Sequence, residues 1–128
     1  FRSVTCGTLH CVAISDEDEL YAWGASGAGR LGLRLDGCIN RWGADSWRRN
    51  AEGSIEVLVP QRVEGLRGVA HASAGWAHTL AATRDGRVFG WGDLSDHCLG
   101  LELGDDADCA EVPVLYPAGL RVKARGAP

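Results

Sequence analysis

The chain has 128 residues, the length of one ordinary domain, and contains 18 glycines but only 4 prolines. Its formal net charge of −4 excludes a global basic field that would attract nucleic acid or an acidic membrane surface. No apolar run approaches the roughly 18 residues that a membrane-spanning helix needs. High glycine without a matching proline content indicates strands joined by tight turns, not a linker.

The five cysteines are odd in number and include no Cys-x-x-Cys pair. This pattern argues against a disulfide framework and predicts a reducing, intracellular compartment. His97, Cys98 and Cys109 match no zinc-binding spacing, so we expect buried or incidental thiols and no metal or cofactor. Because the chain contains no methionine, we expect it to be a piece of a longer protein.

In chain order, the first half predicts three short strands. One strand ends at Gly7, and the next two cover residues 10–15 and 20–24. Their alternating apolar residues are typical of hairpins. Asp18 stands in the turn between the last two strands, at a position that favours a positive φ, and aspartate is among the few residues that tolerate it. Leu31-Gly32-Leu33 follows after a loop.

A long insertion over residues 34–57 separates this tripeptide from Val59-Pro60. Residues 44–52 predict at most two helical turns, capped by Asp45 or Ser46. The insertion contains aromatic and arginine side chains of the types that dominate binding at protein interfaces. They are Arg41, Trp42, Trp47, Arg48 and Arg49. Two interpretations stay open: the insertion contacts a protein partner, or it folds over its own sheet.

The second half repeats the same order of elements. Strands are predicted over 68–75, 78–83 and 88–92, and Gly86 lies in the turn before the last of them. Leu99-Gly100-Leu101 and Val112-Pro113 follow. From Gly32 to Pro60 is 28 residues and from Gly100 to Pro113 is 13, so the first half carries the longer connection.

The connection over 102–111 holds five acidic residues and no basic one. They are Glu102, Asp105, Asp106, Asp108 and Glu111. Their order and spacing do not match a calcium-binding loop. We therefore expect a solvated acidic loop, with contact to a basic partner surface as the open alternative.

Residues 4–33 and 72–101 align without a gap at an offset of 68, and eight of the thirty aligned positions are identical. Among the identical pairs are Gly7 and Gly75, His10 and His78, Trp23 and Trp91, Gly24 and Gly92, and Gly32 and Gly100. Units of this kind bury their apolar faces only against neighbouring units. One complete unit is expected over about 19–83, with incomplete repeats at both ends.

The motif "AGWAHTLAATRDGRVFGWGD" at 74–93, followed by "CLGL" and a later Val-Pro, resembles the regulator of chromosome condensation repeat family, as does "CGTLHCVAISDEDELYAWGASGAGRLGL" at 6–33. The resemblance implies an all-β fold in which 1–128 forms part of one propeller domain. About two blades of four-stranded antiparallel sheet would come from a propeller of about seven. Arg30 and Cys98 stand where the family has glutamine, and Cys11 replaces the usual serine or threonine after His10.

The repeated residues are interpreted as scaffold. No nucleophile with an acid partner recurs beside His10 or His78, so we expect both histidines to hydrogen-bond within their own blades. Trp23 and Trp91 are expected to be buried. The repeated glycines are expected to allow close approach of the backbone. A binding site is expected where the copies differ, in 34–57 and 102–111.

The expected function is a non-catalytic protein-interaction scaffold within a larger protein or assembly. The resemblance leaves two alternatives open. One is guanine-nucleotide exchange on a small GTPase, the activity of the family's founding member. The other is a regulatory propeller fused to an enzyme such as a ubiquitin ligase or a kinase. The predicted partners are proteins, with a small GTPase among the candidates, and not a membrane or nucleic acid.

Overall fold

A computed structural model describes residues 1–33, 35, 43–93 and 109–116. Within them, β-strands dominate, and two short 3-10 turns are the helical elements with defined bounds. No helix of this part is long and apolar enough to cross a membrane. The elements are β1 (Ser3–Cys6), β2 (His10–Ile14), β3 (Leu20–Ala25), η1 (Gly27–Gly29), η2 (Ala44–Ser46), β4 (Trp47–Arg49), β5 (Ile55–Arg62), β6 (Val69–Ala74), β7 (His78–Thr83), β8 (Val88–Asp93) and β9 (Cys109–Leu115).

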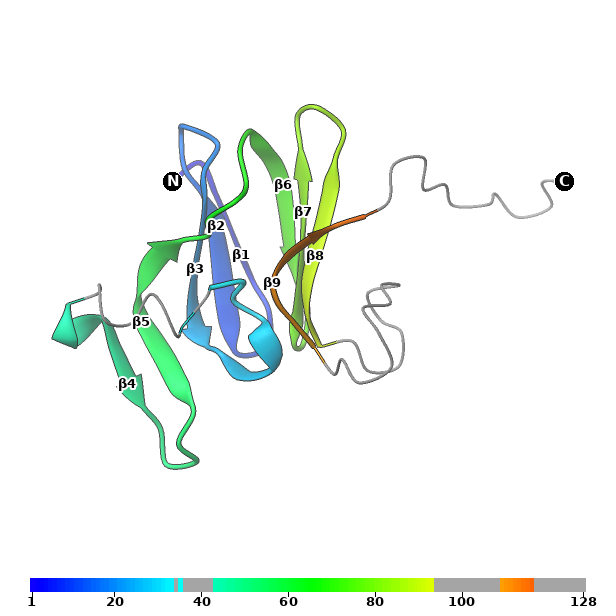
Figure 1. The fold of residues 1–128 in the computed structure, drawn as a ribbon. Coiled ribbons are helices and arrows are strands. Elements are labelled where there is room, and N and C mark those ends of the chain that lie inside the picture. The colour runs from blue at the N-terminus through cyan, green and yellow to red at the C-terminus, as the bar shows by residue number, and fades with distance from the viewer. Residues whose placement is uncertain (34, 36–42, 94–108, 117–128) are drawn as a thin grey trace, which may run out of the picture.

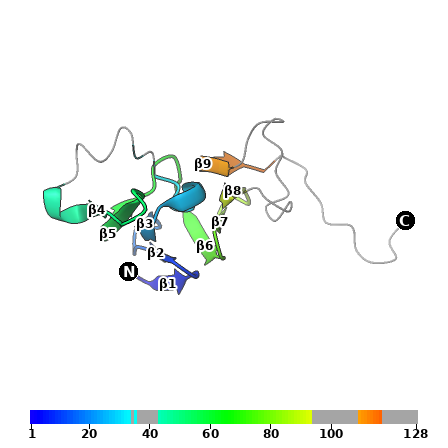
Figure 2. The same cartoon turned by 90° about the horizontal axis from the view of Figure 1, so that it is seen from below.

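These strands form two antiparallel sheets that stand side by side (Figure 1). The first sheet has the order β1-β2-β3-β5-β4 and the second has the order β6-β7-β8-β9. Seen from below, the sheets diverge from the side where β1 and β6 lie toward β4 and β9 (Figure 2). Sheets that fan out in this way, each built from consecutive antiparallel strands, are adjacent blades of a β-propeller.

The two blades place repeated residues at equivalent points. His10 pairs with Gly24 across β2 and β3, and His78 pairs with Gly92 across β7 and β8. In both blades the ladder to the outer strand then shifts register at this glycine. The φ angle is +111° at Gly24 and +113° at Gly92, a conformation that only glycine adopts at little cost. The sequence offset of 68 therefore relates the same structural positions in neighbouring blades.

The turns at the opposite end of the blades also correspond. Asp18 and Gly86 both have positive φ, 61° and 88°, as expected from the sequence. The Asp18 carboxylate accepts a hydrogen bond from Arg84 Nε at 2.6 Å and another from Arg2 Nη2 at 2.9 Å. Since Arg84 lies in the turn of the second blade, Asp18 connects the two blades. Hydrogen bonds from Arg84 first, and then from Arg2, lower the pKa of Asp18 to about 2.

The hydrophobic core fills the space between the blades. Val12 and Leu20 of the first blade and Val69 and Trp91 of the second are fully buried. Leu31 and Leu33, which follow η1, are buried with them and belong to the same cluster. Burying one such side chain stabilises the fold by about 1.5–3 kcal/mol, so the blades depend on each other for much of their stability.

The first blade departs from the expected four strands because β4 adds a fifth strand at its outer edge. Of the two helical turns at most that were expected over 44–52, one short 3-10 turn forms at Ala44–Ser46, and Trp47–Arg49 continue as β4. The predicted capping by Asp45 or Ser46 is wrong, because Gly43 stands at the N-cap. The Asn50 side chain accepts hydrogen bonds from the backbone N–H groups of Glu52 and Ser54, both at 3.0 Å. This local turn brings β4 back along β5 and overrides the helical preference.

Candidate functional site

The repeated histidine of the first blade connects the blades. His10 is 2% exposed, and its Nε2 lies 2.9 Å from the hydroxyl oxygen of Thr79 on β7. The Thr79 hydroxyl donates to the carbonyl oxygen of Arg30 at 2.7 Å, so its oxygen accepts the proton of His10 Nε2. The expectation that His10 bonds within its own blade is therefore wrong. Its partner belongs to the neighbouring blade and lies 69 residues away in the sequence.

This position does not equip His10 for acid–base catalysis near neutral pH. Burial first, and then the positive charge of Arg30 and the electrostatic influence of His78, lower the pKa of His10 to about 4. The ring is consequently neutral at physiological pH and its Nε2 proton is held by Thr79. His78, at the equivalent position of the second blade, is half-buried. His10 thus occupies a structural position between the blades.

The other repeated residues also lie at close contacts between or within blades. An added Cβ at Gly7 would collide with the carbonyl oxygen of Gly75, the equivalent residue of the next blade. At Gly32, whose φ is +68°, a Cβ would lie 2.6 Å from Nε1 of Trp91. Leu31-Gly32-Leu33 of the first blade therefore packs closely on Trp91 of the second. Gly100, the repeat equivalent of Gly32, falls outside the described residues.

The two repeated tryptophans differ in burial. Trp91 is fully buried between the blades, as expected. Trp23 is only half-buried, which differs from the expectation. It lies in a cluster of aromatic rings. Phe1 stacks on Trp23 with ring centroids 6.5 Å apart, and the ring centroids of Phe1 and Tyr21 are 5.3 Å apart. No sheet within the described residues covers Trp23 in the way that the first blade covers Trp91.

The structure describes three of the five predicted binding residues of the insertion, and these three differ in exposure. Trp47 is half-buried and packs against the core of its own blade, opposite Val57. Arg48 and Arg49 are exposed, and Arg48 Nε forms an ion pair with Glu56 at 3.3 Å. Residues 47–57 thus extend their own blade while presenting two arginines to solvent. Arg41 and Trp42 lie outside the described residues.

Most of the acidic connection over 102–111 falls outside the described residues. Asp105, Asp106 and Asp108 lie outside the described residues, as do His97 and Cys98. Cys109 begins β9. In the ranges that the structure describes, no three side chains of His, Cys, Asp and Glu gather closely enough to hold a metal ion.

Both variable connections leave the blades at the same end. β3 ends at Ala25 and β8 ends at Asp93, and the turns before β2 and β7 lie at this lower end in Figure 1. Trp76 in one of these turns is 73% exposed, and Leu9 in the other is 58% exposed. Sequence reasoning missed Trp76, although a large aromatic between Gly75 and Ala77 in a tight turn is a signal of exposure. We call this end of the blades the loop rim.

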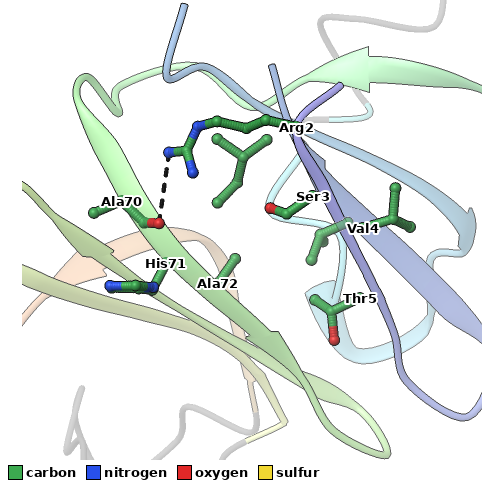
Figure 3. A pocket seen from close by; sticks show the side chains of 9 residues that line it. Arg2, Ser3, Val4, Thr5, Ala70, His71 and Ala72 are labelled. Atoms are coloured by element: carbon green, nitrogen blue, oxygen red, sulfur yellow. Dashed lines mark hydrogen bonds between the residues drawn. The ribbon is translucent and has the colours of Figure 1, made fainter. Parts of the chain in front are cut away.

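A small cavity lies between the inner strands, away from the loop rim. It measures about 280 Å³ and is lined by β1, β2 and β6 (Figure 3). Arg2 reaches across it toward the carbonyl oxygens of Val69 at 2.7 Å and Ala70 at 3.5 Å. This guanidinium also binds Asp18. The charged group that could attract an anion into the cavity is therefore already neutralised by Asp18.

Taken together, the paired blades and their shared contacts define a segment of a β-propeller. A family model of the regulator of chromosome condensation (RCC1) repeat matches residues 17–82, and a second model of this repeat matches residues 1–30 and 69–98. The chain belongs to the RCC1-repeat family.

Curated relatives with this repeat have different activities. The chain is 34% identical over 110 residues to the ultraviolet-B receptor UVR8 of Arabidopsis thaliana, covering 84% of this chain and 20% of that protein. It is also 34% identical over 100 residues to human HERC3, a probable E3 ubiquitin-protein ligase, covering 77% of this chain and 8% of HERC3. The chain thus spans one fifth or less of the length of these relatives.

Solved structures show the same fold. Yeast RCC1 (Prp20) in complex with Kap60 superposes with a TM-score of 0.76 at 23% identity, over 92% of this chain and 25% of that one. Another structure of Prp20p from Saccharomyces cerevisiae, reported with its binding properties to Gsp1p and histones, gives a TM-score of 0.75 at 22% identity. At these identities the likeness establishes the propeller architecture alone.

Proposed function

We propose that this segment serves as a non-catalytic protein-binding module within a propeller. The polar groups that connect the blades support this proposal because they stabilise the fold. His10 and Thr79 bind each other between blades, and Asp18 binds Arg2 and Arg84. The relatives also favour a scaffold, since proteins with such different activities as a photoreceptor and a ubiquitin ligase share this repeat. Binding specificity would then come from the segments that differ between the blades and extend them.

The observation that carries the proposal is the β4–β5 hairpin. It extends the first blade beyond the four strands that the second blade has within the described residues. Arg48, Glu56 and Leu58 share one face of the hairpin by strand alternation, and Leu58 is 45% exposed. Arg49, the register partner of Ile55, is exposed at the opposite face of the hairpin. An arginine beside exposed apolar surface suits an acidic protein segment with an apolar anchor.

The test replaces both arginines in the intact protein, as Arg48→Ala/Arg49→Ala. Proteins that co-purify with the parent are identified, and their affinities for parent and variant are then measured with purified components. We expect at least one affinity to weaken by about 2 kcal/mol or more, the level of an interface hot spot. The free energy of unfolding should change by no more than about 0.5 kcal/mol, because both side chains are exposed.

Arg67→Ala is the matched control because Arg67 is also exposed but lies in the connection between β5 and β6, at the opposite end from the loop rim. It should bind every partner with the affinity of the parent protein. If the double variant retains all partner affinities, the hairpin is only a structural extension of its blade. If Arg67→Ala weakens binding equally, the effect is one of general charge and not of this hairpin.

Guanine-nucleotide exchange on a small GTPase is the second candidate, favoured by the similarity to Prp20p. Similarity to HERC3 equally favours a propeller joined to an enzyme domain. The exchange candidate is tested by measuring release of labelled GDP from a small GTPase with the intact protein. We expect no acceleration. Acceleration by several orders of magnitude would replace the scaffold proposal by an exchange function.

A further inference from the structure

Two cysteines face each other across the first hairpin. Cys6 on β1 is the register partner of Cys11 on β2, and their sulfur atoms lie 2.6 Å apart. Gly7 N–H donates to the carbonyl oxygen of His10 at 2.8 Å, so Gly7 and His10 form a hydrogen-bonded pair. Since the two pair types alternate along an antiparallel ladder, Cys6 and Cys11 form the closer, non-hydrogen-bonded type. Its typical Cα separation of about 4.5 Å lies within the range that a disulfide spans.

The location of the pair follows from the repeat. Its equivalents in the second blade are Ala74 and Thr79, which are also register partners. Thr79 faces the first blade, where it binds His10. Cys6 and Cys11 therefore lie on the face of the first blade that points away from the second. With no blade of the described residues over this face, Cys6 is exposed and Cys11 is half-buried. The equivalent residues of the second blade, which the first blade covers, are half-buried at Ala74 and fully buried at Thr79.

We propose that Cys6 and Cys11 form a redox site, which closes to a disulfide by exchange with a low-molecular-weight disulfide of the glutathione class. The Cys6 thiolate attacks one sulfur of the disulfide and releases one glutathione thiolate. Cys11 then gives up its proton and attacks the mixed disulfide at Cys6, which releases the second glutathione. Two protein thiols are oxidised to one disulfide, glutathione disulfide is reduced to two thiols, and the two protons end on the released glutathione.

The order of attack follows from the surroundings of the two thiols. Burial of Cys11 and its hydrogen bond with Cys6 raise the pKa of the Cys11 thiol to about 11. Thiolate is the attacking species, so Cys11 is a poor first nucleophile, whereas the exposed Cys6 is accessible. Within the hairpin, Cys11 lies next to the mixed disulfide that forms at Cys6, which makes the second attack intramolecular.

The position of the two cysteines in one hairpin also predicts that a Cys6–Cys11 disulfide forms reversibly. A disulfide between residues 6 and 11 closes a very short loop, and short loops gain little stabilisation from closure. Exposed disulfides of this kind have more oxidising potentials and belong to the labile class. The hairpin ladder already holds β1 and β2 together, so the reduced state remains folded. A single exchangeable bond also differs from the disulfide framework that the cysteine count argued against.

The sequence provides a direct assay. Trypsin cleavage after Arg2 and Arg30 releases residues 3–30, which contain Cys6 and Cys11 and no other cysteine. The intact protein is equilibrated in buffers of increasing glutathione disulfide, quenched in acid, alkylated in denaturant and digested. Alkylation in denaturant makes the result independent of thiol accessibility. We expect peptide 3–30 to change from doubly alkylated to unalkylated and two hydrogens lighter, and to return when reduced glutathione is restored.

Variants separate the two roles. Cys11→Thr introduces threonine, the residue that stands at the equivalent position 79 of the second blade. In this variant Cys6 should accumulate as a glutathione adduct. In Cys6→Ala, which places alanine here as at the equivalent Ala74, the hydrogen bond with Cys6 is lost, but burial still raises the pKa of the Cys11 thiol. Cys11 should therefore react more slowly in this variant than Cys6 does in Cys11→Thr. Parent peptide that stays doubly alkylated in the most oxidising buffer would overturn the proposal. So would a parent that accumulates only glutathione adducts, or equal rates in the two variants.

Discussion

Replacing Gly32 with alanine should destabilise the contact between the blades. Gly32 has φ of +68°, and a Cβ at this position would lie 2.6 Å from Nε1 and 2.9 Å from Cδ1 and Cε2 of Trp91. Trp91 is fully buried, so its ring cannot turn away into solvent. The Gly32→Ala variant must therefore either displace the Leu31-Gly32-Leu33 segment or move Trp91 within the core.

The loss of unfolding free energy expected for Gly32→Ala has two parts. A left-handed conformation costs alanine about 1–2 kcal/mol more than glycine, and forcing a methyl group into a packed core adds about 1–3 kcal/mol. The free energy of unfolding should fall by about 2–5 kcal/mol in total. Gly68→Ala isolates the first part, because Gly68 has nearly the same φ, +62°, and nothing within 4 Å of the added Cβ. The control should lose only about 1–2 kcal/mol.

Urea unfolding of the intact protein measures both variants against the parent. A double-mutant cycle then tests the cause: Trp91→Phe removes the indole nitrogen that the new methyl group would meet, so Gly32→Ala should cost less in that background. If Gly32→Ala and Gly68→Ala lose the same stability, the steric term is absent and the proposed packing of this segment on Trp91 is refuted. An unchanged cost in the Trp91→Phe background would have the same meaning.

Three more substitutions test two other contacts between the blades. Asp18 has a pKa of about 2, below the unfolded value of about 4, so its contribution is present above about pH 4 and is lost as the pH falls toward 2. Asp18→Asn tolerates the positive φ but should flatten this acid-dependent loss of stability, and an unchanged pH profile of the urea midpoint would contradict the prediction. Thr79→Val should cost at least about 1–3 kcal/mol in urea unfolding by leaving His10 Nε2 and the Arg30 carbonyl unpaired, whereas Thr79→Ser should retain most of the stability. Equal losses in the two Thr79 variants would show that the hydroxyl is not the stabilising group.

Features that depend on local residue spacing were predictable from the sequence. The offset of 68 identified Gly24 and Gly92, and both adopt the same positive φ beside the same register shift. The turn positions of Asp18 and Gly86 were predicted for the same reason, since a hairpin turn requires a positive φ that few residue types tolerate. The all-β fold and the family followed from these repeated local signals.

The tertiary structure decided every feature that depends on a partner distant in the sequence. Nothing near His10 indicates that its hydrogen-bond partner is Thr79 of the next blade. Trp47–Arg49 has no strand periodicity of its own and becomes β4 because β5 offers an unpaired edge. Trp23 and Trp91 have the same local motif, yet only Trp91 is fully buried, because burial depends on whether another blade covers that face. A repeat sequence specifies the blade, while the contacts between blades determine which of its side chains are buried, paired or exposed.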